Sequence, residues 1–270
     1  MLEILQYGFM QRAFIAGIMI AIICSAIGTF IVLKRLSMIG DGLAHIALGG
    51  IALGLFLNVY PVITALLFSA ISALGINRLR KTKIHGDVAI AIFFSAGLAV
   101  AVVVLSLANG INVDLFSYLF GSILTVNETD LQIILGLGIL TVGAIILFYK
   151  ELVYLTFDEE SAMVSGIPVD KLNDVLVVLT AITVVISIKI VGVLLVSSLL
   201  VVPAATSLQI SKNFKETILF STVFAILSVI TGLISSYYFN IATGGAIVLV
   251  SIVFFIGITL YKNFELKLKA

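Results

Sequence analysis

An aspartate and a histidine stand four residues apart in an apolar stretch of the chain, as Asp41 and His45 in SMIGDGLAHIALGG. On a helix this spacing puts both side chains on one face, with Cβ atoms about 5–6 Å apart. A carboxylate oxygen and an imidazole nitrogen placed in this way can bind a divalent transition metal. The pattern predicts a metal site. An aspartate that caps its own helix and a histidine bonded to a neighbouring helix would leave the same pattern.

The other ionisable groups near apolar segments have simpler explanations. His85 and Asp87 follow a basic cluster at 78–83, which suits a water-exposed loop with Asp87 in the first turn of the next helix. Asp114 is expected to cap a short helix or to face an incoming ion. Lys189 is expected to extend its ammonium from a tight turn to the membrane surface. Only Asp41 and His45 therefore remain as candidates for chemistry inside the apolar segments.

The composition is that of a membrane protein, because 61% of the 270 residues are hydrophobic and 11% are charged. Soluble domains carry roughly 25% charged residues. No basic patch rich in aromatics indicates nucleic-acid binding, and the single cysteine, Cys24, excludes an intrachain disulfide. There is no phosphate-binding Gly-x-x-x-x-Gly-Lys-Ser/Thr loop and no catalytic Ser/Cys-His-acid set. We therefore expect a membrane protein that is not itself an enzyme and binds no nucleic acid.

Apolar stretches long enough to cross a bilayer predict an all-α, polytopic protein. A crossing helix needs about 20 apolar residues. Pro61 marks the start of the third segment, since proline is tolerated in the first turn of a helix. Residues 115–124 are too few to cross and predict a short re-entrant or interfacial helix. The predicted segments are 14–33, 43–60, 62–77, 88–108, 131–149, 175–188, 190–208, 218–239 and 242–261.

The stretch 175–208 decides between eight and nine crossings. As one helix it would be about 50 Å long, against a hydrocarbon core of about 30 Å. If it crosses twice, 13 of the 15 basic residues share one side of the membrane, with Arg12 and Lys189 opposite. The positive-inside rule favours this arrangement. We therefore expect nine helices in a single transmembrane domain, 1–270, with the N-terminus outside and the C-terminus cytoplasmic.

The polar segment 150–174 carries the signals of a short helix. Thr156-Phe-Asp-Glu fits a capping box, and Gly166 followed by Pro168 is a helix stop. These signals predict a helix at 157–165. A connector could be much shorter, so this segment is either a docking point for another protein or a surface helix.

Five segments in this order resemble the permease subunit of the metal-ion ABC importers, which take up zinc or manganese. The resemblance covers nearly the whole chain. The segments are 9–12 (FMQR), 36–50 (LSMIGDGLAHIALGG), 113–121 (VDLFSYLFG), 157–166 (FDEESAMVSG) and 189–206 (KIVGVLLVSSLLVVPAAT).

The resemblance implies an ABC importer permease fold in the cell membrane and no permanently bound cofactor. It implies that two copies of the chain form the pore, that separate ATPase subunits bind inside, and that a metal-loaded binding protein docks outside. Asp41 and His45 match the metal ligands of the family. The family's coupling helix, which receives the ATPase, matches Phe157, Asp158, Glu159, Glu160, Ser161, Ala162 and Gly166.

The transported metal is expected to be zinc. Ala44-His45-Ile-Ala-Leu-Gly lacks the proline of the Ser-His-Ala-Val-Leu-Pro-Gly pattern that manganese-type members show more often. Manganese or iron is the alternative within the family. A transporter driven by an ion gradient is a further alternative, but it would need coupling carboxylates or histidines deep in several helices, and only the helix with Asp41 and His45 offers any. A metalloprotease would need His-Glu-x-x-His, which the sequence lacks.

Overall fold

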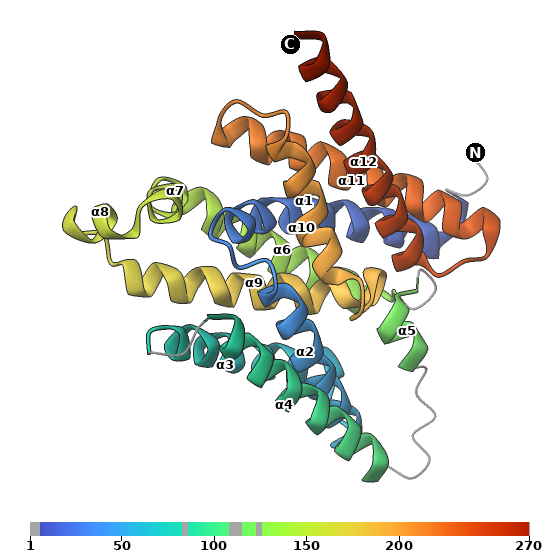
Figure 1. Cartoon of the computed structure of the whole chain (residues 1–270). Coiled ribbons are helices and arrows are strands. Elements are labelled where there is room, and N and C mark those ends of the chain that lie inside the picture. Colours follow the sequence, from blue (N-terminus) through green and yellow to red (C-terminus); the bar gives the residue numbers. More distant parts are fainter. Residues whose placement is uncertain (1–5, 83–85, 108–114, 123–125, 270) are drawn as a thin grey trace.

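The computed structural model describes residues 6–82, 86–107, 115–122 and 126–269, and these residues form helices and their connections without a strand (Figure 1). In chain order the helices are α1 (Gly8–Leu33), α2 (Ile39–Phe56), α3 (Pro61–Arg80), α4 (Gly86–Leu107), α5 (Leu115–Phe120), α6 (Glu128–Leu147), α7 (Tyr149–Phe157), α8 (Glu159–Val164), α9 (Val169–Val191), α10 (Val196–Leu208), α11 (Phe214–Phe239) and α12 (Thr243–Lys269).

Eight of these helices are long and apolar enough to cross a membrane: α1, α2, α3, α4, α6, α9, α11 and α12. The ninth predicted segment corresponds to α10, an apolar helix of 13 residues. The expectation of an all-α membrane protein with eight to nine transmembrane helices is confirmed, and α3 begins at Pro61 as predicted.

The break in the stretch 175–208 lies at Gly192, three residues after the predicted one. Lys189 is the last basic residue inside α9, and Gly192 ends that helix with φ 88°. At 1.5 Å per residue α9 is about 34 Å long and α10 about 20 Å. Two helices therefore replace the single long one, but α10 is shorter than a full crossing.

The short helix α5 packs against the turn between α9 and α10. Val193 N donates to Tyr118 O at 2.9 Å, and Leu194 N donates to Leu119 O at 3.2 Å. A Cβ on Gly192 would lie 2.4 Å from the carbonyl oxygen of Leu119, so only glycine allows this approach. The turn is therefore held by main-chain hydrogen bonds to a segment 75 residues earlier in the chain.

Helices α1, α2 and α9 are the most buried of the long helices, and the others carry exposed apolar side chains suited to lipid. Helix α2 packs against both α3 and α4. A Cβ on Gly50 would lie 2.6 Å from Ala65 Cα, so glycine at this position allows α2 and α3 to approach closely.

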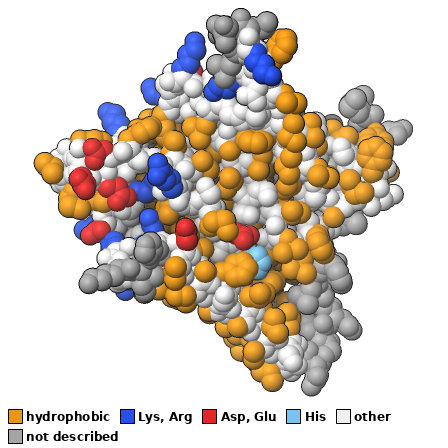
Figure 2. All heavy atoms as spheres, in the orientation of Figure 1, with side chains coloured by type: hydrophobic (Ala, Val, Ile, Leu, Met, Phe, Trp, Pro, Cys, Tyr) orange, Lys and Arg blue, Asp and Glu red, His pale blue; other side chains and the backbone are white. Residues whose placement is uncertain are grey.

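Helix α9 runs from one end of the bundle to the other, and we name the ends by the short helices found there. The α8 end holds α7, α8, the last residues of α1 and α3, and the start of α9. The α5 end holds α5, the end of α9 and the start of α6 (Figure 1). In the face that Figure 2 shows, charged side chains gather at the α8 end and near the tip of α12, while hydrophobic side chains cover the middle.

A candidate metal site on α2 and polar clusters at both ends

Asp41 and His45 both lie in α2, Asp41 in its first turn and His45 one turn later. The ring nitrogen Nδ1 of His45 is 3.1 Å from the main-chain oxygen of Asp41. A carbonyl oxygen only accepts hydrogen bonds, so this contact makes Nδ1 the protonated nitrogen. The other nitrogen, Nε2, then carries the lone pair that a cation needs.

Two other helices support the pair. The His45 ring lies against the ring of Phe94 in α4, with 4.2 Å between centroids. The hydroxyl of Ser197 in α10 donates to Oδ1 of Asp41 at 3.4 Å, a long hydrogen bond. Asp41 and His45 are both half-buried. Figure 2 shows one histidine beside an acidic side chain, surrounded by hydrophobic side chains and away from the charged α8 end.

The pair offers two ligands. In the described part of the chain, no group of three or more His, Cys, Asp or Glu side chains lies close enough together to hold a metal ion. A closed structural zinc site needs four protein ligands. This site can therefore bind a cation only with ligands from elsewhere, such as water or another chain.

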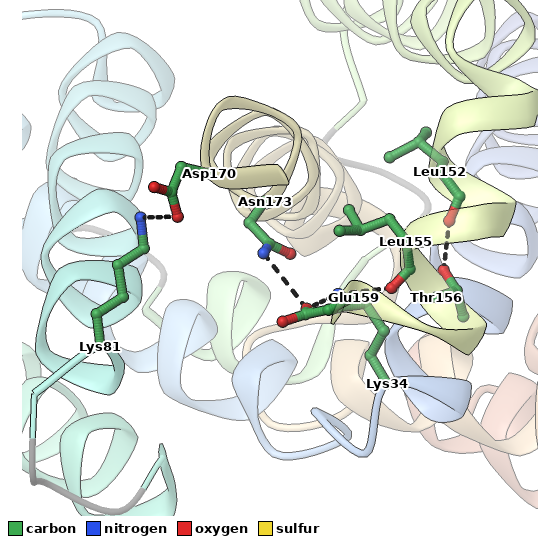
Figure 3. Close-up of polar contacts among 8 residues, drawn as sticks. All are labelled: Lys34, Lys81, Leu152, Leu155, Thr156, Glu159, Asp170 and Asn173. Atoms are coloured by element: carbon green, nitrogen blue, oxygen red, sulfur yellow. Dashed lines mark hydrogen bonds and ion pairs between the residues drawn. The ribbon is translucent and has the colours of Figure 1, made fainter. Parts of the chain in front are cut away.

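The predicted short helix is present, but its start differs from the prediction. Phe157 is the last residue of α7, and α8 begins at Glu159. Asp158, not Thr156, is the cap: its side chain accepts from Ser161 N at 2.9 Å. Thr156 donates instead to Leu152 O at 2.6 Å within α7 (Figure 3). The hydrogen bonds from Ser161 hold the pKa of the Asp158 carboxyl below its usual value.

The residues of the predicted coupling helix face in two directions. Ala162 is fully buried, whereas Phe157, Met163 and Val164 expose 64%, 62% and 89% of their surface. Gly166 has φ +80° and ends the helix, as predicted. These three exposed apolar side chains lie at the α8 end of the bundle, and Met163 and Val164 among them were not singled out from the sequence.

Glu159 does not point freely into solvent. It forms an ion pair with Lys34, the residue that follows α1, and accepts from Nδ2 of Asn173 in α9 at 3.3 Å (Figure 3). Burial lowers the pKa of the Lys34 ammonium. Partial burial alone would raise the pKa of Glu159, but the Lys34 ammonium and the Asn173 amide outweigh it and lower that pKa. The lowered pKa of Glu159 favours the carboxylate that pairs with Lys34.

The expectation that Lys189 reaches the membrane surface is wrong. Its side chain is 15% exposed and its Nζ lies 3.2 Å from Oδ2 of Asp130, whose side chain is 1% exposed. Tyr60 donates to the other oxygen of Asp130 at 2.5 Å. The Lys189 ammonium also lies 5.2 Å from the centre of the Tyr118 ring. The lysine has a buried partner, so it does not need to reach water.

Asp130 was missed because the predicted segment began one residue later. The capping sequence Asn127-Glu-Thr-Asp was the available signal: Asp130 N donates to Asn127 Oδ1 at 2.8 Å, and Asn127 N donates to Asp130 Oδ2 at 3.2 Å. Asp87 lies in the first turn of α4 as expected. The expectations for His85 and Asp114 fall outside the described residues.

Comparison with known proteins places the chain in a family. The model of the ABC 3 transport family matches residues 6–262. A probable metal transport system membrane protein of Treponema pallidum is 41% identical over 92% of this chain and 94% of its own length. Manganese transport system membrane protein MntC of Listeria innocua is 36% identical, covering 94% and 91%. High-affinity zinc uptake system membrane protein ZnuB of Haemophilus influenzae is 35% identical, covering 93% and 96%.

A solved structure gives the same result for the fold. A chain of PsaBC from Streptococcus pneumoniae in complex with Fab superimposes with a TM-score of 0.88 at 34% identity, over 99% of this chain and 97% of that one. The family match and these relatives extend over both the α2 pair and the α7–α8 segment. The chain therefore belongs to the ABC 3 transport family and is a membrane permease subunit of a metal-ion ABC importer.

Proposed function

We propose that this chain forms the translocation pore for a divalent transition metal, and that Asp41 and His45 bind the metal as it passes. The geometry of the pair carries the proposal: both side chains lie on one face of α2, and the hydrogen bond from His45 Nδ1 to Asp41 O leaves Nε2 free to bind. Two ligands hold an ion less tightly than a closed four-ligand shell. Such binding suits a pore, because the ion must leave again.

A second copy of the chain completes the proposed site. One chain supplies a carboxylate and an imidazole, and no third such side chain joins them within the described residues. Two copies facing each other across a pore would supply two of each. This proposal agrees with the partial exposure of Asp41 and His45 in the single chain.

Zinc is the metal that this ligand set favours. Two imidazole nitrogens and two carboxylate oxygens suit four-coordinate zinc, and such sites bind zinc more tightly than manganese. The motif around His45, which lacks proline, supports the same choice. Manganese is the alternative, since manganese transport proteins are among the relatives.

The partners follow from the absence of an ATP-binding sequence. We propose that an ATPase subunit docks at the α8 end, on the exposed apolar side chains of Phe157, Met163 and Val164. This end would then face the cytoplasm, together with the C-terminus. A metal-binding protein would deliver the ion at the α5 end, and the complex would reside in the plasma membrane. The Lys and Arg side chains at the α8 end support this orientation, because basic residues collect on cytoplasmic surfaces (Figure 2).

Uptake of radioactive zinc and manganese tests the proposal. The chain is reconstituted in proteoliposomes with its ATPase and binding protein, and Asp41→Asn and His45→Leu are compared with the parental chain. Each substitution keeps the approximate size of the side chain and removes a ligand, so we expect uptake to be abolished while the complex still assembles. Parental uptake by either variant would contradict the assignment.

Asp87→Asn is the matched control. Asp87 also lies in the first turn of a helix, but it is exposed and belongs to α4. It should keep parental uptake, which would separate loss of a ligand from loss of any first-turn carboxylate. Preferential uptake of manganese over zinc would support the assigned site and identify manganese as the transported metal.

A further inference from the structure

Lys34 and Glu159 connect two segments that are 125 residues apart in the sequence. Glu159 is the first residue of α8, the helix proposed to receive the ATPase. Lys34 follows α1 directly and begins the turn that leads into α2, the helix with the proposed metal ligands. The Lys34 ammonium also lies 3.5 Å from the carbonyl oxygen of Leu155 in α7 (Figure 3). One side chain thus joins α7 and α8 to the turn before α2.

The two partners differ in exposure. The side chain of Lys34 is 5% exposed and that of Glu159 is 50% exposed. The other charged group that acts on both is Arg80 at the end of α3. A buried ammonium needs its carboxylate because water cannot replace it. A movement of α8 that displaces Glu159 should therefore displace Lys34 as well.

The turn between Lys34 and α2 is short and well ordered by hydrogen bonds. Arg35 adopts φ 57°, Leu36 N donates to Ile31 O at 2.9 Å, and Ile39 N donates to Leu36 O at 2.9 Å. The side chains of Leu36 and Ile39 are 6% and 0% exposed. The turn is therefore anchored at both ends and can pass a displacement from Lys34 to the first turn of α2, where Asp41 lies.

We propose that the Lys34–Glu159 ion pair is the positioning contact that transmits movement of α8 to the metal-binding turn of α2. The proposal rests on the proposed function and adds to it the residues through which the ATPase acts on the site. Glu159 and Lys34 touch neither metal nor nucleotide; they act through the turn at 34–38. The hydrogen bond from Asn173 keeps Glu159 oriented toward Lys34.

A second ion pair at the same end provides a matched control. Lys81, after α3, and Asp170, in the first turn of α9, are 2.7 Å apart (Figure 3). Their side chains are 42% and 73% exposed. This pair lies at the same end of the bundle and also bonds to α9, but it joins neither α8 nor the turn before α2. Its loss should not alter coupling.

The test measures metal uptake and ATP hydrolysis in the same proteoliposomes, made with this chain, its ATPase and its binding protein. The ratio of metal moved to ATP hydrolysed does not depend on how many complexes each preparation contains. Lys34→Glu and Glu159→Lys should each lower the ratio on the order of tenfold, within the range of measured couplings between sites. Glu159→Gln, a milder change, should lower it in the same direction.

The double variant Lys34→Glu/Glu159→Lys restores opposite charges and should recover at least about half of the parental ratio, because the contact is pairwise. Lys81→Glu and Asp170→Lys should keep the parental ratio. Parental ratios in both single variants, or a double variant no better than the singles, would overturn the link while leaving the pore function in place. A parental complex that moves no metal would refute the proposed function itself, on which the link depends.

Discussion

The two ends of the bundle each hold a long-range ion pair, and the pairs differ in how they are enclosed. At the α5 end Asp130 and Lys189 have side chains 1% and 15% exposed, and Tyr60 and Asn127 also bond to the carboxylate. At the α8 end Lys34 is nearly buried, but Glu159 is half exposed. Neither partner of the first pair is more than 15% exposed, whereas one partner of the second is half exposed.

This difference in exposure indicates that one ion pair stabilises the fold and the other transmits movement. A fully buried pair cannot lose one partner without leaving a charge that nothing solvates. A pair that is open on one side can rearrange, because water replaces part of what the exposed partner loses. We therefore expect the α5-end pair to hold the fold together and the α8-end pair to respond to a docked partner.

The largest effect on stability should come from Lys189→Met. The substitution keeps the apolar stem and leaves the Asp130 carboxylate buried without its ammonium. A loss of about 3–5 kcal/mol is expected, measured as unfolding of the purified chain in detergent. The double variant Lys189→Met/Asp130→Asn removes both charges and should recover most of that loss. If Lys189→Met lowers the free energy of unfolding by no more than the ~0–1 kcal/mol typical of an exposed pair, the two ion pairs do not differ in their contribution to stability.

Gly192→Ala should have the next largest effect. The residue has φ 88°, and its new Cβ would lie 2.4 Å from Leu119 O, so the turn between α9 and α10 must shift away from α5. The expected cost is about 1–3 kcal/mol. The control is Gly143→Ala in α6, where a Cβ meets nothing within 4 Å; it should be neutral or stabilise by up to about 1 kcal/mol. Equal unfolding curves for the two variants would contradict the strain at Gly192.

Glu159→Gln should cost about 1 kcal/mol, because the glutamine Oε1 and the carbonyl oxygen of Leu155 still accept from Lys34 and residue 159 is half exposed to water. The sign of its pH dependence follows from the lowered pKa of Glu159. The contribution of the pair is present above the ordinary glutamate pKa of about 4.3 and is lost as the pH falls through the lower folded value. Unfolding midpoints of the parental chain and the variant should differ near neutral pH and converge in acid. A difference that persists unchanged in acid would mean that charge is not its cause.

Lys81→Met should have the smallest effect. Its pair with Asp170 is exposed on both sides, so a change within about 0–1 kcal/mol is expected. The same unfolding measurement places all four variants on one scale. A larger loss at Lys81 than at Glu159 would reverse the order that exposure predicts.

Local patterns were enough to predict most elements of the fold, although α7 (Tyr149–Phe157) was not predicted. The nine apolar segments, the start of α3 at Pro61 and the helix stop at Gly166 all depend on residues within a few positions of one another. The errors were also local. The cap of α8 was assigned to Thr156 because a threonine three residues before a glutamate fits the capping pattern, whereas Asp158 offers a carboxylate nearer the helix start. The break near Lys189 was placed at the charge, but the positive φ that ends the helix belongs to Gly192.

The sequence by itself determined that the chain lies in lipid and that Asp41 and His45 share a face of one helix, because composition and a spacing of four residues do not depend on distant partners. Only the tertiary structure decided which charges are paired. Asp130 meets Lys189 and Lys34 meets Glu159 across 59 and 125 residues of chain. Neither pairing could be predicted from a local sequence pattern, because the partners are far apart in the chain. Each exists because one of its charges, Asp130 or Lys34, is buried and needs an opposite charge beside it.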